Sequence, residues 1–310
     1  MKVKLKFAIT YPPHAFRWFE EIGIAVSRAL RELGYNSEVV TTGSLSYFSD
    51  KTYDAVFVLA PHEYLKAGFS TFKKNPKTVY AMWELEQTPH HDSTCPIMED
   101  KWIQFKKYSG FFDIILTESE CKTKYINSKG VEAHTVPIGY HPQFKNIERP
   151  REHKKWDILF LGILFHRRKQ ILEQLEAKGF KVFHPPDLHN FFDPRRKAEI
   201  VARSRVCLNV HHNECNAFEK PRLIQDYMSN HAFVITEKID HPEGFISGKH
   251  WIMADYNNLV ATTARWLNKT QRERDRVAEE GFKYVTTEYT MKAFVEKYVG
   301  LVKKKRKSKF

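Results

Sequence analysis

Apolar residues along the first third of the chain follow two periods, one typical of strands and one typical of helices. Residues 3–9 and 53–60 are apolar runs of strand length, and a proline-containing segment follows each. Between them, apolar residues recur at spacings of three and four over residues 22–33, and Gly34 ends that run. This order of strand, helix and strand predicts the start of a parallel sheet covered by helices.

The alternation resumes after a charged interruption. Residues 145–155 are rich in charged side chains, contain Pro150 and carry few apolar residues, which is typical of a linker. A second series of strands and helices begins at residues 156–162 and runs to two long polar helices near the C-terminus. We therefore predict an α/β protein with an N-terminal domain over residues 1–150, a C-terminal domain over residues 151–290, and a closing helix with a basic tail over residues 291–310.

The size and composition fit two globular domains. The chain has 310 residues, of which 42% are hydrophobic and 28% charged. No stretch reaches the roughly 18 consecutive apolar residues of a membrane helix, and the apolar run near the N-terminus is too short for a secretory signal. We therefore predict a cytoplasmic protein. Four cysteines in a chain of this length do not indicate a disulfide framework.

The chain is basic, with a formal net charge of +13. Removing the six basic residues of the C-terminal tail leaves +7, so the body is basic as well. Such a charge favours anionic partners, namely nucleotide phosphates, nucleic acid or an anionic lipid surface. The tail itself fits either an anionic surface or a solvated end. Its basic residues are Lys303, Lys304, Lys305, Arg306, Lys307 and Lys309.

The first strand of the C-terminal domain ends in a candidate phosphate-binding segment. Open parallel sheets bind ligands at the carboxyl ends of their strands. Here Gly162 follows the strand, and Arg167 and Arg168 stand just before a predicted helix. Glycine lets a phosphate approach the backbone, and guanidinium groups attract a diphosphate. The alternative is a solvated basic helix start. Neither a GxGxxG nor a GxxxxGK[ST] motif occurs, which disfavours a dinucleotide-dependent oxidoreductase and a phosphate-loop NTPase.

A second polar cluster follows the strand predicted at residues 206–210. It leads into a helix predicted at residues 221–229, where Asp226 stands about one turn from the start and is placed to accept both hydroxyls of a ribose. The alternative is a capped helix with surface charges. The other candidates in this cluster for binding the same nucleotide ligand are His211, Asn216, Glu219, Lys220 and Arg222.

A zinc site built from Cys207, His211, His212 and Cys215 is disfavoured. Cys207 lies inside an apolar strand, and the spacing differs from that of structural zinc sites. We expect no metal.

In the N-terminal domain, three loops that follow strands contain acidic, histidine and aromatic residues, over residues 11–17, 61–64 and 83–92. Their candidate catalytic residues are His14, Glu84 and Glu86, which are of the types that orient an acceptor hydroxyl or take its proton. Taken singly, each is more often an ordinary surface residue.

The C-terminal half resembles glycosyltransferases of the GT-B fold, in particular the retaining branch with nucleotide-sugar donors. Residues 159–172 are similar to the family's strand, glycine and basic segment, and residues 218–237 to its helix with a ribose-binding carboxylate. In that helix Asp226 aligns with the second glutamate of the family's pair, and Phe218 stands at the first. Residues 203–214 and 136–144 resemble the family's donor loop and interdomain segment.

This resemblance implies two Rossmann-like domains that face each other across a cleft, with the C-terminal helix packing back toward the N-terminal domain. It also implies transfer of a sugar from a UDP- or GDP-sugar to a hydroxyl acceptor, with no metal and no further cofactor. Asp226 would hold the ribose, while Arg167 and Arg168, with Lys220 or Arg222, would stabilise the departing diphosphate. The acceptor stays open among polysaccharide, lipid, protein and a modified nucleic-acid base.

Two other classes compete with this interpretation. A non-enzymatic nucleic-acid-binding protein would use the same basic surface, but the sequence contains no recognised binding module. An oxidoreductase acting on nucleotide sugars is disfavoured by the missing glycine motif. Slow hydrolysis of a nucleotide sugar would distinguish the transferase from both.

Overall fold

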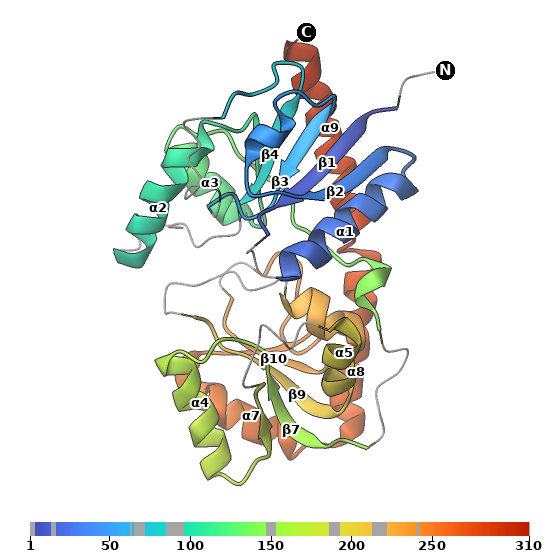
Figure 1. Cartoon of the computed structure of the whole chain (residues 1–310). Coiled ribbons are helices and arrows are strands. Elements are labelled where there is room, and N and C mark those ends of the chain that lie inside the picture. The colour runs from blue at the N-terminus through green and yellow to red at the C-terminus, as the bar shows by residue number, and fades with distance from the viewer. Residues whose placement is uncertain are drawn as a thin grey trace. The chain divides into compact units, whose positions relative to one another are not determined.

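The structure is a computed structural model that describes residues 4–13, 17–62, 64, 72–84, 96–146, 153–185, 193–212, 222–239 and 242–309. The chain divides into two compact units (Figure 1), unit 1 with Met1–Ile138 and Met291–Phe310, and unit 2 with Gly139–Thr290. The division therefore comes before Gly139, whereas the sequence suggested a boundary at residue 150. Local hydrogen bonds explain the difference, because the Tyr140 N–H donates to the Tyr289 carbonyl and the Asn146 N–H to the Asn230 side chain.

Unit 1 contains a six-stranded sheet in which every described pairing is parallel. The strand order is β2-β1-β3-β4-β5-β6, so the order reverses between β1 and β3. Such a reversal leaves a crevice at the carboxyl ends of the two strands. The strands are β1 (Lys6–Tyr11), β2 (Asn36–Thr41), β3 (Ala55–Val58), β4 (Val79–Glu84), β5 (Ile114–Thr117) and β6 (His134–Thr135).

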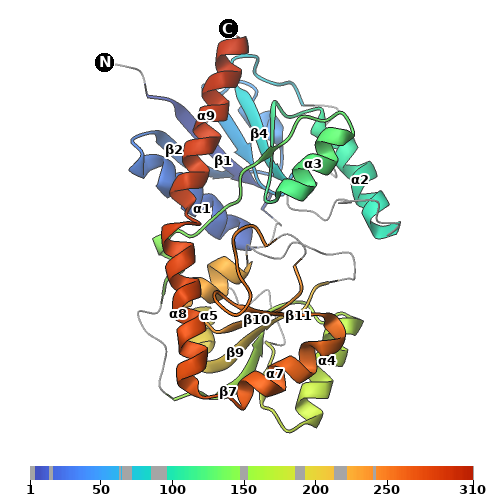
Figure 2. The ribbon, with the colours of Figure 1, turned by 180° about the vertical axis from the view of Figure 1, so that it is seen from behind.

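Helices cover both faces of this sheet because alternate strand residues point to opposite sides. Phe57 of β3 packs against Phe294 and Tyr298 of α9, with ring centroids 5.8 and 5.0 Å apart. Its neighbour Val56 instead joins the cluster that contains Phe105 of α2. Helix α9 runs along one face, beside α1 (Figure 2). The helical elements are α1 (Arg17–Glu32), η1 (Leu45–Phe48), α2 (Pro96–Ser109), α3 (Glu120–Ser128) and α9 (Met291–Lys309).

Helix α9 confirms that the C-terminal helix packs on the N-terminal part of the chain. Its buried residues recur at helical spacing on the side that meets the sheet, as shown by Phe294, Tyr298 and Val302. The helix continues to Lys309, so the basic tail is helical through that residue rather than a loose end.

Unit 2 repeats the same sheet order. Its five parallel strands are arranged β11-β10-β9-β7-β8, and the order reverses between β7 and β9. Helices α4 and α7 pack on one face, and α5 with the segments η5 and η6 on the other (Figure 1). The strands are β7 (Trp156–Phe160), β8 (Val182–Phe183), β9 (Ser204–Asn209), β10 (Val234–Glu237) and β11 (Ile252–Ala254). The helical elements are η4 (Pro142–Phe144), α4 (His166–Ala177), α5 (Pro194–Ala202), η5 (Leu223–Tyr227), η6 (Met228–Asn230), η7 (Tyr256–Asn258), α7 (Leu259–Leu267) and α8 (Gln271–Thr287).

The predicted fold class is thus confirmed as α/β with two parallel, helix-covered sheets. Within the described part of the chain, no helix is both long and apolar enough to span a membrane.

Candidate functional site

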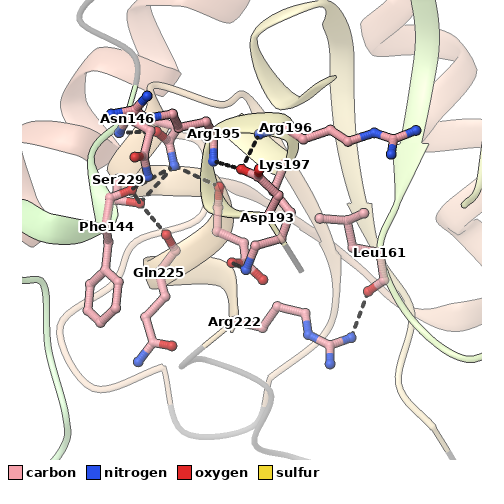
Figure 3. A network of polar contacts seen from close by, with 12 residues as sticks. Phe144, Asn146, Leu161, Asp193, Arg195, Arg196, Lys197, Arg222, Gln225 and Ser229 are labelled. Carbon is pink, nitrogen blue, oxygen red and sulfur yellow. Dashed lines mark hydrogen bonds and ion pairs between the residues drawn. The ribbon is translucent and has the colours of Figure 1, made fainter. Parts of the chain in front are cut away.

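The carboxyl end of β7 closes tightly around Gly162. A Cβ added there would lie 2.8 Å from the Phe160 ring and 3.4 Å from Arg222 Nη1, so a side chain does not fit without a shift. Arg222 Nη1 donates to the Leu161 carbonyl at 2.7 Å (Figure 3). The Leu161 N–H in turn donates to the Tyr227 hydroxyl at 2.9 Å. Gly162 is therefore required by packing, and Arg222 is positioned at the point where the strand order reverses.

Arg167, at the start of α4, forms a two-pronged ion pair with Glu237 at the end of β10. Both N–O distances are 2.8 Å, and Arg167 Nη1 also donates to the His211 carbonyl at 3.1 Å. The guanidinium lies 4.1 Å from the centroid of the Tyr256 ring. Sequence reasoning missed both Glu237 and Tyr256, although an acidic residue that ends an apolar strand was a usable signal for the first. This pair fixes α4 to β10.

Arg168 is buried and ties the loop after β7 to the end of β9. Its Nε donates to the Val210 carbonyl at 2.9 Å and its Nη1 to the Ile163 carbonyl at 3.1 Å. Only 6% of the residue is exposed. The Arg168 guanidinium therefore holds the loop after β7 in place through hydrogen bonds to backbone carbonyls.

His211 follows β9 and is held on three sides. Its N–H donates to Glu237 Oε2 at 2.9 Å, its carbonyl accepts from Arg167, and its Nε2 lies 2.9 Å from the Lys238 carbonyl. Because a carbonyl only accepts, Nε2 is the donor, which in the neutral tautomer leaves Nδ1 as an acceptor. Nδ1 is buried and has no hydrogen-bond partner among the described residues. A buried acceptor without a donor is costly, so His211 offers an acceptor position beside the strand reversal.

Asp226 lies in η5, which is a π-helical segment rather than the predicted α-helix. The Ser229 hydroxyl of η6 donates to the Gln225 carbonyl of η5 (Figure 3). His231, with φ 55°, ends η6 in the left-handed conformation. π-Helical turns are rare and are frequent at functional sites. Asp226 Oδ1 pairs with Lys197 Nζ at 2.8 Å, and their side chains are 16% and 7% exposed. Lys197 of α5 gave no signal in the sequence beyond its charge.

Comparisons with known proteins bear on this half of the chain in particular. A family described as glycosyl transferase-like matches residues 167–300, a span that begins at Arg167 and includes His211, Arg222 and Asp226.

Residues 167–300 therefore contain a glycosyl transferase-like domain. Solved structures show the fold. Sucrose-phosphate synthase from Thermosynechococcus elongatus is 12% identical, with a TM-score of 0.67, over 97% of this chain and 99% of that one. AviGT4, a glycosyltransferase involved in avilamycin A biosynthesis, is 12% identical, with a TM-score of 0.62, over 98% of each chain. The DNA modifying enzyme β-glucosyltransferase is 13% identical, with a TM-score of 0.57, over 96% of this chain and 100% of that one. A sequence comparison with curated proteins finds no match.

In unit 1, the predicted catalytic Glu84 is fully buried at the end of β4. The Tyr108 hydroxyl donates to Glu84 Oε2 at 2.6 Å, and Lys122 Nζ donates to the Glu84 carbonyl at 3.0 Å. Lys122 Nζ also lies 4.0 Å from Glu84 Oε1. This arrangement links β4, α2 and α3, so the structure gives Glu84 a packing environment rather than an exposed position.

Several predicted residues lie outside the described part of the chain. They are His14 and Glu86 among the catalytic candidates and Asn216, Glu219 and Lys220 among the donor-binding candidates. Of the disfavoured zinc set, Cys207 is buried inside β9, where burial raises the pKa of its thiol. Cys215 also lies outside the described residues.

Proposed function

We propose that this chain is a glycosyltransferase that moves a sugar from a UDP- or GDP-sugar to a hydroxyl acceptor, and that unit 2 holds the donor. The observation that supports this most directly is the Asp226–Lys197 pair on the π-helical segment. Lys197 takes Oδ1 of the carboxylate, and the structure gives Oδ2 no partner among the described residues. Oδ2 is thus available to accept from ribose hydroxyls, while the Lys197 ammonium balances the charge of the carboxylate.

The diphosphate has a suitable place at the start of α4. Phe165 at its N-cap makes no side-chain capping bond, and the helix dipole favours an anion at this end of α4. Arg167 is 14% exposed at this point. Its charge is shared with Glu237, so we assign it to shaping the site as much as to binding phosphate. Arg222 beside Gly162 adds positive potential where the leaving diphosphate gains charge.

The chemistry proposed here uses no metal and no further cofactor, because cationic side chains and a helix terminus supply the positive charge. Full activity in the presence of EDTA is the expected result, and loss of activity that Mg²⁺ restores would refute this part. The β-glucosyltransferase named above has uridine diphosphoglucose as its substrate, which supports a UDP-linked donor. The acceptor is a hydroxyl of a polysaccharide, lipid, protein or modified base, and we place the protein in the cytoplasm.

Donor binding tests the site assignment. Melting temperatures with UDP-glucose and with a GDP-sugar would identify the donor class, and slow donor hydrolysis would separate this proposal from non-enzymatic nucleic-acid binding. Asp226→Asn is expected to weaken donor binding by roughly ten- to a hundredfold, the value of a hydrogen bond to a charged group. The matched control is Asp157→Asn, because Asp157 pairs with Arg205 at the amino end of β7, away from the carboxyl ends of the strands. Unchanged donor affinity in Asp226→Asn would contradict the assignment.

A further inference from the structure

Basic residues from two segments that are far apart in sequence lie together at the end of the unit 1 sheet where the strands begin, which we call its amino edge. Residues 72–78 lead into β4, and residues 303–309 end α9. Lys309 joins the two, because its Nζ donates to the Thr78 carbonyl at 3.1 Å and to Asp113 Oδ2 at 2.8 Å. We give the name lysine edge to six of their nine basic residues: Lys73, Lys74, Lys77, Lys304, Lys305 and Lys307.

Three other cations of α9 attach the helix to unit 1 and orient the lysine edge. Lys303 donates to the Tyr35 hydroxyl at 2.9 Å, Arg306 pairs with Asp54, and Lys309 pairs with Asp113. Their spacing of three residues places them on one side of the helix. Lys304 and Lys307 therefore lie on other sides, and both are exposed.

Positive charge exceeds negative charge at this edge. Asp113 is the carboxylate in contact with Lys74, at 4.0 Å, and with Lys309, at 2.8 Å. Burial lowers the pKa of Lys74, and Lys309 and Lys305 lower it further against the attraction of Asp113. Burial likewise lowers the pKa of His134, with Lys304 and Lys305 acting in the same direction and Glu132 in the opposite one. An external anion would relieve this repulsion.

Stabilisation of the α9 helix dipole explains only some of the basic residues at this edge. Cations in the last turn of a helix stabilise its dipole, which accounts for residues such as Lys307. It does not account for Lys73, Lys74 and Lys77, which belong to the segment before β4 and add their charge at the same edge.

We propose that the lysine edge docks unit 1 on an anionic phospholipid bilayer. All but one of the basic residues in the two segments are lysine, whose flexible ammonium suits diffuse attraction to a charged leaflet. Within the described chain, neither of the two segments has an exposed large apolar side chain. The apolar side of α9 is buried against the sheet. Docking is thus electrostatic, without insertion, and independent of the donor site.

Nucleic acid fits this edge less well. Proteins hold single strands by stacking bases on aromatic rings, and arginine is the side chain that binds a phosphate through two parallel hydrogen bonds. The exposed basic residues of these two segments are all lysines. An acceptor nucleic acid held at the amino edge would also lie away from the carboxyl ends of the same strands, where parallel sheets bind substrates.

The test is co-sedimentation of the full chain with vesicles of phosphatidylcholine containing about one third phosphatidylglycerol. We expect binding that pure phosphatidylcholine does not support and that about 0.5 M salt abolishes. The variant Lys304→Gln/Lys305→Gln/Lys307→Gln should lose roughly fivefold in affinity for each lysine. Its matched control removes three exposed lysines of unit 2, Lys178, Lys181 and Lys283, by the same change and should bind like the parent.

Donor hydrolysis by the triple variant reports that it is folded, and this readout keeps the docking proposal separate from the proposed function. If the triple variant does not fold, Lys304→Gln and Lys307→Gln as single variants replace it. Equal losses in the lysine-edge variant and its control would overturn the proposal. So would absence of binding to anionic vesicles, or binding to a short DNA duplex, but not to vesicles, that depends on the lysine edge.

Discussion

Units 1 and 2 share a strand order around their first strand, yet the residues at their strand reversals differ. In unit 2 the reversal is lined by ion pairs, Arg167 with Glu237 and, nearby, Lys197 with Asp226. In unit 1 the residue near the end of β1 is Thr10, whose hydroxyl lies 3.1 Å from that of Tyr64. Burial raises the pKa of Tyr64, so this phenol stays neutral.

The strand order determines where each unit has a crevice, and the side chains at that crevice determine which ligand can bind there. The reversed strand order gives each unit a crevice position. The proposed donor site in unit 2 contains fixed charges, which suit a charged nucleotide, whereas the described side chains at the unit 1 reversal are neutral hydroxyls. The charge of Glu84, further along the unit 1 sheet, is balanced by Lys122 beneath the surface.

The largest expected effect comes from breaking the ion pair that unites the unit 2 site. Glu237→Gln removes the charge that pairs with Arg167 and weakens the acceptor for the His211 N–H. We expect a loss of about 3–5 kcal/mol in the free energy of unfolding, because a largely buried cation loses its partner. Urea unfolding measures it. Glu38→Gln is the control, since Glu38 pairs with Lys6 in an exposed bridge and should cost under about 1 kcal/mol. Similar losses in both variants would contradict this account.

Each unit has a buried lysine beside a carboxylate, and replacing each lysine tests whether the two pairs have different roles. Lys122→Met leaves Glu84 buried without its cation and should destabilise the protein by about 3 kcal/mol, with donor affinity unchanged. Lys197→Met leaves Asp226 without its partner and should weaken donor binding by about tenfold. Urea unfolding and donor titration of both variants provide the measurements. Donor affinity that falls equally in both variants would argue against separate roles.

A smaller effect is expected from filling the space at the unit 2 reversal. Gly162→Ala places a methyl group 2.8 Å from the Phe160 ring and should cost about 1–3 kcal/mol by overpacking. Gly43→Ala is the matched control in unit 1, because a Cβ there meets no atom within 4 Å. Thermal unfolding distinguishes the two, and equal melting temperatures would show that the Gly162 loop adapts.

The sequence predicted the fold well because its signals are local. Apolar runs and helical spacing located most strands. Gly162 and Asp226 were chosen as candidates from their positions after a strand and within a predicted helix. Such patterns depend only on neighbours along the chain.

The partners of the site residues could not be predicted in the same way. Arg167 meets Glu237 seventy positions later, and Lys197 reaches Asp226 from another helix. Glu84 looked like an exposed loop residue, whereas Tyr108 and Lys122 enclose it. These contacts depend on how distant elements pack, which one sequence does not specify locally.

The smallest effect expected is a pH dependence of stability that arises in unit 2. His250 Nδ1 accepts from the Ile246 N–H at 3.0 Å, so the folded protein needs the neutral ring. Burial lowers the pKa of His250, Lys249 lowers it further, and Glu280 opposes them. The unfolded chain therefore binds the proton first as pH falls, so stability is intact above about pH 6.5 and declines below it. Urea midpoints between about pH 7.5 and about pH 5.5 should show the decline. His250→Gln should flatten it and exposed His153→Gln should not, and an unchanged slope in His250→Gln would assign the dependence to another group.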